Sequence, residues 1–248
     1  MVKVIICIYL IFELPCIHIM DSDFKMQGGF QQAKNRIGSG NEGSVYRMPD
    51  GTATKLVGNS LYGNPESNQA LINKIKQLKD KGVHIPEIHS IKQLKSKTRL
   101  PAFLINTDLI PNEKHLADSV RDVTLEKADL QMQFLESLSD DMWKTCAKDL
   151  CEICRAGLEI DLNPFTNNLI LYNNGKDYNV YIVDCYRFLG LNSHVENFGI
   201  YDIDEILPKF KYYLDSRISS WKFIGEPRKK LFLDKVNNLI LIEVSKCV

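Results

Sequence analysis

The fold is decided by a glycine-rich stretch, IGSGNEGSVY, at residues 37–46. Its glycines, Gly38, Gly40 and Gly43, let a backbone approach phosphate groups that any Cβ would push away, and Val45 is placed to pack on a purine ring. A dinucleotide-binding turn has the same glycine spacing but leads into a helix. Here the chain continues as a strand into a Pro-Asp-Gly turn, which favours a phosphate-binding β-hairpin.

The next strand carries a lysine among apolar residues. Lys55 stands in the sequence Ala-Thr-Lys-Leu-Val. A lysine that points inward from a strand needs an anion, and the α- and β-phosphates of ATP would provide one; the alternative is an edge-strand lysine. A helix is expected from Pro65 to Lys81. If the strand lysine resembles that of protein kinases, where a glutamate on the next helix holds it, Glu66 near the helix start is the expected partner of Lys55. Glu66 can equally be a glutamate that the helix dipole favours at a helix start.

Two more strands are expected at residues 86–91 and 102–105, separated by a lysine-rich turn. The chain that follows the second of these strands should pass a nucleotide base. Asp108 and Ile110 are therefore the expected adenine contacts, through backbone N–H and C=O groups.

The second half of the chain is predicted to be mostly helical. A helical pattern covers residues 118–158, with Met142, Cys146, Leu150 and Cys154 at four-residue steps on its core face. A hairpin is expected from strands at 168–172 and 178–183. Amphipathic helices are expected at 203–218 and 228–244.

Three polar residues of this half resemble the catalytic-loop and metal-binding residues of protein kinases, and this resemblance implies a role in phosphoryl transfer for each. Asp161 follows the long helix and would accept or orient the proton of a substrate hydroxyl, although a simple helix-terminating turn explains it equally well. Asn168 comes seven residues later at the head of an apolar strand, and it would hold Mg²⁺. Asp184 ends the next strand, sixteen residues after Asn168, and would bind the Mg²⁺ that bridges the ATP phosphates.

These motifs resemble those of protein kinases in their order and approximate spacing. They are the glycine-rich loop, the strand lysine, the helix glutamate, the aspartate and asparagine of the loop after the long helix, and the aspartate at the strand end. The resemblance covers residues 35–190 and implies an α+β, bilobal protein-kinase-like fold that binds ATP and Mg²⁺. It implies a β-rich N-lobe at 28–110 and a reduced helical C-lobe at 111–248. The chain departs from the kinase pattern at Glu159-Ile160, in place of His-Arg, and at Cys185-Tyr186, in place of Phe-Gly. Without the arginine, activity should not depend on a phosphorylated activation loop.

The short C-terminal part has no Ala-Pro-Glu segment and resembles the minimal kinases that Gram-negative bacteria inject into host cells by type III secretion. This group includes the OspG and NleH kinases and a class that phosphorylates the host's ATP-driven heat-shock chaperone. The resemblance implies phosphorylation of serine or threonine in a eukaryotic host protein, in the host cytoplasm. A heat-shock chaperone is one candidate substrate. Without this resemblance, the expected location is the cytoplasm.

Two other functions remain open. A small-molecule kinase of the aminoglycoside or lipopolysaccharide-sugar type shares the fold and often has a changed catalytic loop. A pseudokinase would keep the fold as a binding module without chemistry, and the changed His-Arg and Phe-Gly positions favour it. The presence of Lys55, Asp161, Asn168 and Asp184 together argues against it, because a scaffold does not need all four.

Composition excludes some partners and leaves the N-terminus open. The 31 basic and 31 acidic residues cancel, so no global field draws the protein to nucleic acid. Seven cysteines, an odd number, favour free thiols and a reducing compartment. Residues 1–27 have three interpretations. They are an artefact of a mis-assigned start, with translation beginning at Met20 or Met26; or they are a targeting leader; or they form a strand. The apolar run there is too short and interrupted for stable membrane insertion.

Overall fold

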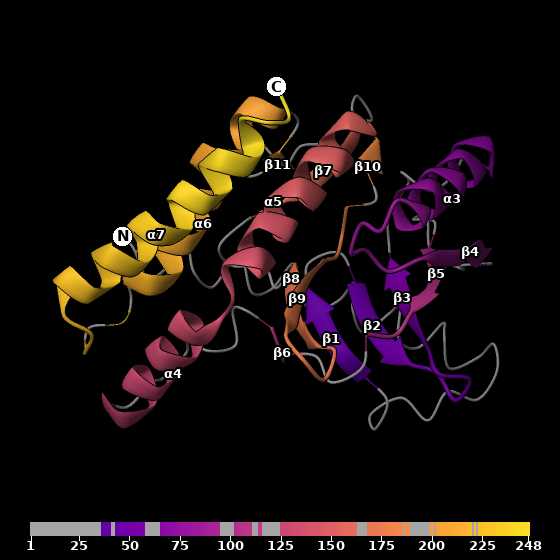
Figure 1. The fold of residues 1–248 in the computed structure, drawn as a ribbon. Helices are drawn as coiled ribbons and strands as arrows, with labels where there is room; N and C mark the ends of the chain where they lie inside the picture. The colour runs from indigo at the N-terminus through magenta and orange to yellow at the C-terminus, as the bar shows by residue number, and fades with distance from the viewer. Residues whose placement is uncertain are drawn as a thin grey trace, which may run out of the picture. The chain divides into compact units, whose positions relative to one another are not determined.

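The described residues of this chain fold as a mixed α/β protein. The structure, a computed structural model, describes residues 36–40, 43–57, 65–94, 102–110, 114–115, 125–162, 168–185, 187–188, 199–200, 202–219, 221 and 223–248. In those residues it has a five-stranded antiparallel sheet and five helices (Figure 1). Contacts divide the chain into two units, Met1–Asn73 with Glu87–Leu109 and Lys74–Pro86 with Ile110–Val248. The expected leader at residues 1–27 lies outside the described residues.

The first unit contains the five-stranded sheet, with strand order β1-β2-β3-β5-β4. A Pro-Asp-Gly turn joins β2 to β3, as the sequence predicts: the Asp50 carboxylate accepts hydrogen bonds from the backbone N–H of Thr52 at 3.0 Å and from its hydroxyl at 2.7 Å. Gly51 adopts a φ of 84°, which favours glycine. The strands are β1 (Arg36–Gly40), β2 (Gly43–Arg47), β3 (Thr52–Val57), β4 (Ile88–Leu94) and β5 (Ala102–Asp108).

Side chains on both faces of this sheet are buried. Tyr46, Leu56 and Ala102 form an apolar cluster on one face, where Leu94 and Leu104 pack against them. Residues at alternate positions of β3 point to the opposite face, and Ala53 and Val57 are also buried there. The burial pattern of β3 agrees with this, because four of its six residues, on both faces, are buried.

Helix α3 (Pro65–Asp80) follows β3 and confirms the predicted helix within one residue of its end. Its buried residues Leu71, Ile75 and Leu78 recur at helical spacing. The helix stops at Gly82, which has a φ of 83° and donates its N–H to the C=O of Lys79 at 2.8 Å. A glycine in the left-handed conformation is a common way to end a helix.

The second unit contains four helices in its described part: α4 (Leu125–Ser137), α5 (Asp140–Arg155), α6 (Ile203–Ser219) and α7 (Glu226–Val244). Helices α6 and α7 pack against α5 and against each other (Figure 1). Trp143 of α5 lies edge-on to Phe210 of α6 and Phe232 of α7, with ring centroids 6.3 and 6.2 Å away. The predicted core face of α5 is confirmed, because all four of its predicted residues are buried.

Short strands complete the second unit. Strand β8 (Leu169–Asn173) pairs with β9 (Tyr178–Ile182) as the predicted hairpin, and β6 (Lys114–His115) extends that pair to three strands. A second set, which the sequence analysis did not predict, has β7 (Leu158–Asp161) between β10 (Arg187–Phe188) and β11 (Gly199–Ile200). None of the described helices has both the length and the apolar character that a membrane-spanning segment needs.

Candidate active site

Four of the five strands of the first unit bring the predicted phosphate-binding residues into one row. Gly38 is paired with Val45, Val45 with Lys55, and Lys55 with Ile105. Directly opposed residues of neighbouring antiparallel strands project their side chains from the same face. The sheet therefore places the first glycine of the loop, the predicted purine-packing valine and the strand lysine side by side.

The glycines of the loop differ in whether the surrounding structure requires a residue without a Cβ. At Gly43, a Cβ would lie 1.7 Å from the carbonyl oxygen of Leu56, so the close approach of β2 to β3 itself requires glycine. At Gly38, the nearest atom to an added Cβ is the Cβ of Val45 at 3.9 Å, an ordinary contact. Gly40 is paired with Gly43 at the end of the hairpin. Packing among the described residues therefore requires glycine at Gly43 and does not require it at Gly38.

Lys55 is half-buried among apolar neighbours. Ala53 and Val57, which share its face, are 5% and 0% exposed, and Ile105 opposite is fully buried. An ammonium group in such surroundings is stabilised by a nearby anion, because desolvation otherwise penalises the charge. The position of Lys55 on the strand thus suits a phosphate contact.

Glu66, the expected partner of Lys55, lies in the first turn of α3. Its side chain is exposed. This place favours a carboxylate through the helix dipole alone. Both interpretations of Glu66 offered by the sequence therefore stand.

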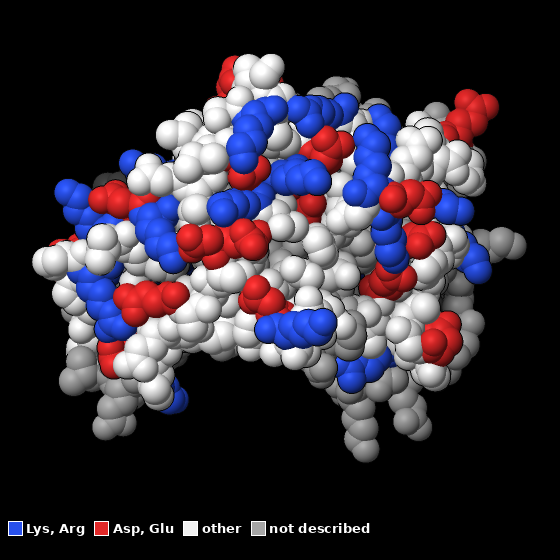
Figure 2. All heavy atoms as spheres, in the orientation of Figure 1, with Lys and Arg blue, Asp and Glu red and all other residues white. Residues whose placement is uncertain are grey.

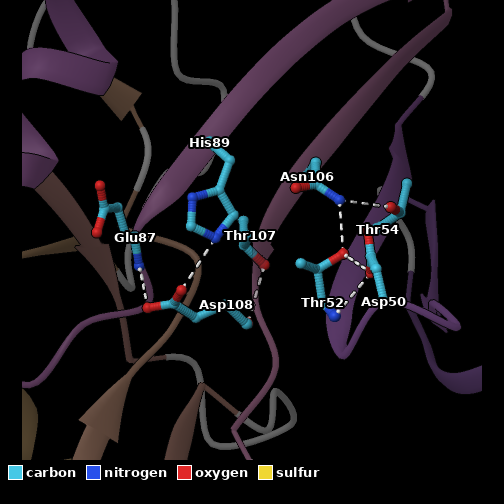
Figure 3. A network of polar contacts seen from close by, with 8 residues as sticks. All are labelled: Asp50, Thr52, Thr54, Glu87, His89, Asn106, Thr107 and Asp108. Carbon is cyan, nitrogen blue, oxygen red and sulfur yellow. Dashed lines mark hydrogen bonds and ion pairs between the residues drawn. The ribbon is translucent and has the colours of Figure 1, made fainter.

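Asp108, an expected adenine contact, is bonded within the first unit (Figure 3). Its carboxylate accepts a hydrogen bond from the backbone N–H of Glu87 at 3.1 Å and lies 3.0 Å from Nε2 of His89. Its own backbone N–H donates to the C=O of Glu87 at 3.1 Å, and the Thr107 hydroxyl donates to its C=O at 3.2 Å. Asp108 thus ties the end of β5 to the start of β4. Ile110, the other expected contact, is buried.

The β8–β9 hairpin brings the two predicted metal ligands to one end of a strand pair. Leu169 is paired with Ile182, and one step further the N–H of Val183 donates to the C=O of Asn168 at 2.9 Å. Asp184 follows directly after Val183. Asn168 is only 7% exposed, so its amide is held inside the fold rather than in solvent.

Asp184 has an unusual backbone conformation. Its φ is 60°, and it is the only non-glycine residue in the described part of the chain with a positive φ. Aspartate tolerates this left-handed region better than most residues, but the conformation still carries strain, and such strain concentrates at functional sites. Cys185 follows and is fully buried, with its thiol 3.9 Å from the C=O of Ile182. Burial, with the nearby Asp184 charge, raises the pKa of Cys185 to about 12, so the thiol is protonated at neutral pH.

Asp161 is the last residue of β7, where it is paired with Gly199 of β11. The strand is flanked on its other edge by β10, in which Arg187 is paired with Glu159. Glu159, which stands where kinases have histidine, is buried. The residues between Leu162 and Asn168 lie outside the described part, so the predicted loop is seen only at its two ends.

The surface electrostatics match the composition. Figure 2 shows acidic and basic side chains interspersed over the face it displays, with no large area of a single sign. Within the described ranges, no three His, Cys, Asp or Glu side chains gather as a metal site. Mg²⁺ nevertheless binds through one or two carboxylates together with substrate phosphates and water, so a set with one carboxylate and one amide still fits this ion.

Sequence reasoning missed one buried polar pair. His84, in the turn after α3, donates its N–H to the Asp149 carboxylate at 3.1 Å, and its Nδ1 lies 2.8 Å from the same oxygen. The C=O of His84 accepts the N–H of Ile182 in β9 at 2.9 Å. This turn is thereby anchored to α5 and to the strand that leads to Asp184. The residues are 65 positions apart, so no local pattern could have signalled the pair.

Comparison with known proteins does not assign the chain to a family. No protein-family model matches the chain, and no curated protein matches it.

Proposed function

We propose that this chain is an ATP- and Mg²⁺-dependent protein kinase with a bilobal kinase-like fold that phosphorylates serine or threonine. The observation that carries the proposal is the end of the β8–β9 hairpin opposite its turn, where Asn168 and Asp184 are brought together and Asp184 holds a left-handed backbone. Backbone strain concentrates at functional sites, and a carboxylate that follows a buried amide at one strand end is a pair that would suit Mg²⁺.

The first unit supports the proposal independently. Its row of Gly38, Val45 and Lys55 combines a backbone that phosphates can approach, an apolar surface and a cation. These are the three features that bind the phosphates and base of a nucleotide.

The proposed roles follow from the residue types. Lys55 would bind nucleotide phosphates, with Glu66 as its proposed partner, while Asp184 and Asn168 would hold Mg²⁺. When bound, Mg²⁺ neutralises the charge that develops on the phosphates. Asp161 would orient the substrate hydroxyl and accept its proton as the γ-phosphoryl group is transferred.

The proposed protein substrate comes from the resemblance to secreted effector kinases. It is a eukaryotic host protein, with an ATP-driven heat-shock chaperone as one candidate, and the proposed place of action is the host cytoplasm. On the face drawn in Figure 2, acidic and basic side chains are interspersed.

A pseudokinase is the second candidate, and one observation favours it. The Asp108 N–H is donated to Glu87, and the Asp108 carboxylate is bonded to Glu87 and His89. These groups are thus engaged within the sheet, which leaves fewer backbone groups at β5 to recognise an adenine edge.

A phosphate-transfer assay separates the candidates. The full chain is incubated with γ-labelled ATP, Mg²⁺ and a eukaryotic cell lysate, beside an Asp184→Asn variant. Asparagine tolerates the left-handed conformation as aspartate does, so this variant keeps the backbone while removing the charge. Labelled protein bands that depend on Asp184 support a protein kinase. If both proteins leave the lysate unlabelled while ATP still raises the melting temperature, the chain is a binding module or acts on a small molecule.

A further inference from the structure

The fold brings three cysteines of the second unit together. Cys151 and Cys154 lie on α5, one helical turn apart, and Cys247 is the penultimate residue of the chain. Cys247 is in side-chain hydrogen-bond contact with Cys151, although they are far apart in sequence. All three are free thiols. A close pair of thiols that the proposed phosphoryl transfer does not use is a candidate for covalent chemistry.

The C-terminal turn that carries Cys247 is fixed in place by several bonds. Helix α7 packs along α5, and Val244 in its last turn is buried (Figure 1). The Cys247 N–H donates to the Val244 C=O at 2.8 Å, and its thiol lies 3.3 Å from the Glu243 C=O. Arg155, at the end of α5, donates from Nη2 to the C=O of Cys247 at 2.5 Å. The sulfur of Cys247 is therefore held at the end of α5 rather than on a loose tail.

We propose that Cys247 and Cys151 form a reversible disulfide when the protein meets a hydroperoxide. In the first step, the Cys247 thiolate attacks the peroxide oxygen, which gives Cys247 sulfenic acid and releases the alkoxide or hydroxide. In the second step, the Cys151 sulfur attacks the sulfenic sulfur, the S–S bond forms, and the sulfenic oxygen leaves as water with the Cys151 proton. The peroxide takes up the two electrons that the two thiols lose.

Exposure assigns the two roles. Cys247 is half-buried, so peroxide can reach its sulfur. Cys151 is fully buried, and burial, together with its hydrogen bond to Cys247, raises the pKa of its thiol. A buried, protonated thiol is a poor first target for peroxide but can serve as the second partner once Cys247 is oxidised.

The other described cysteines are less well placed to form a disulfide with Cys247. Burial and the charges of Asp202 and Glu205 raise the pKa of Cys154 to about 12, so Cys154 faces the acidic start of α6. Cys146 and Cys185 are fully buried.

The disulfide between Cys247 and Cys151 would fasten the C-terminal end of the chain to α5. This inference does not depend on kinase activity, and its test needs none.

Peptide mapping tests the pairing. The reduced full chain is treated with hydrogen peroxide, its remaining thiols are alkylated under denaturing conditions, and it is digested with a protease that cleaves after glutamate. Cleavage after Glu152 separates Cys151 from Cys154, and cleavage after Glu243 releases the C-terminal peptide. Cys146 lies on the same peptide as Cys151, so fragmentation of the linked peptide in the mass spectrometer identifies which of the two is bonded. We expect that C-terminal peptide to be joined to the peptide ending at Glu152, with two fewer alkylated cysteines per chain and complete reversal by dithiothreitol.

Single substitutions supply the controls. Cys154→Ser, a matched change on the same helix, should leave the linked peptide in place, whereas Cys151→Ser and Cys247→Ser should abolish it. Cys247→Ser lies at the half-exposed chain end, so it gives an answer even where a core substitution unfolds the protein. The inference is overturned by a link from Cys247 to Cys154 or Cys146, or by oxidation of Cys247 to sulfinic or sulfonic acid without a link.

Discussion

The backbone C=O of Asn168 accepts the N–H of Val183 at 2.9 Å, and this bond brings Asn168 and Asp184 to the same end of the β8–β9 hairpin. The two residues are sixteen positions apart, but the hairpin closes that separation. Each strand contributes one oxygen-bearing side chain at this end, which is the composition that a Mg²⁺ ion shared with nucleotide phosphates requires.

Replacing Asn168 should therefore weaken the metal dependence of phosphate transfer. Because one oxygen ligand is lost while Asp184 remains, we expect Asn168→Ala to raise the Mg²⁺ concentration for half-maximal activity about tenfold or more. The measurement is a Mg²⁺ titration of transfer at fixed ATP. Asn179→Ala, on the partner strand of the same hairpin, is the control and should leave the titration unchanged. An unchanged titration for Asn168→Ala would remove Asn168 from the proposed site.

Lys55 should be needed for nucleotide phosphates rather than for folding. Its amine lies on a face with buried Ala53 and Val57, where methionine fits, so Lys55→Met should keep the melting temperature within a few degrees. Loss of the phosphate contact should lower kcat/KM for ATP about a hundredfold, a change of roughly 2.7 kcal/mol. Lys92→Met, on exposed β4, is the matched control. Equal kcat/KM values for the two variants would argue against a nucleotide bound beside Gly38, Val45 and Lys55.

Two glycines of the loop should respond differently to alanine. A Cβ at Gly43 would overlap the Leu56 carbonyl, so Gly43→Ala should lower the free energy of unfolding by about 3 kcal/mol. Gly38→Ala meets only ordinary contact and should change stability by less than about 1 kcal/mol. If phosphates approach the Gly38 backbone, Gly38→Ala should still weaken ATP binding about tenfold, or 1.4 kcal/mol. Denaturant melts and calorimetric ATP titration measure the two effects; unaltered ATP affinity would contradict the phosphate assignment.

The His84–Asp149 pair should stabilise the second unit. The Asp149 side chain is 4% exposed, so His84→Ala leaves a buried carboxylate without its ring partner and should lower the free energy of unfolding by about 2 kcal/mol. His89→Ala is the control: its pair with Asp108 is 38% and 31% exposed, so the loss should be under about 1 kcal/mol. Urea unfolding measures both. Equal losses would show that burial does not govern these pairs.

The Arg228 network should give a pH-dependent contribution to stability. Arg228 donates from Nε and Nη2 to the Glu136 carboxylate at 2.8 and 2.6 Å, and from Nη1 to Asp129 at 2.5 Å. The hydrogen bond from Arg228 holds the pKa of Glu136 below its ordinary value. Because the pKa is depressed in the folded state, the stabilisation is present above the unfolded pKa, about 4.3, and is lost as the pH falls through the folded value.

The variant Arg228→Gln should therefore lose about 1 kcal/mol of unfolding free energy at pH 7, a modest value because solvent screens this partly exposed network. The deficit should shrink as the pH falls below about 4, where Glu136 becomes protonated in both proteins. Urea unfolding from pH 7 to pH 3 checks this. A deficit that is constant with pH would mean that packing of the arginine, and not its charge, stabilises the α4–α7 contact.

Local patterns in the sequence predicted much of the secondary structure. The apolar spacing of α3, α5, α6 and α7, the Pro-Asp-Gly turn and the β8–β9 hairpin were all predicted, because each depends on residues a few positions apart. The same patterns singled out Lys55, Asn168 and Asp184 as polar residues at strand positions. The short strands β7, β10 and β11, of four, two and two residues, were missed, since strands this short owe their pairing to distant segments and not to their own sequence.

Composition and local spacing by themselves determined the order of the helices and of the longer strands, and the residue types available for chemistry. Only the tertiary structure decided that Asp184 holds a left-handed backbone and that Asp108 is bonded to Glu87 and His89. It also decided that Lys74–Pro86 belongs to the second unit, and that Cys247 lies beside Cys151. The physical reason is the same in each case: these contacts join residues that are distant in sequence, and their geometry is set by packing and hydrogen bonds that no local propensity encodes.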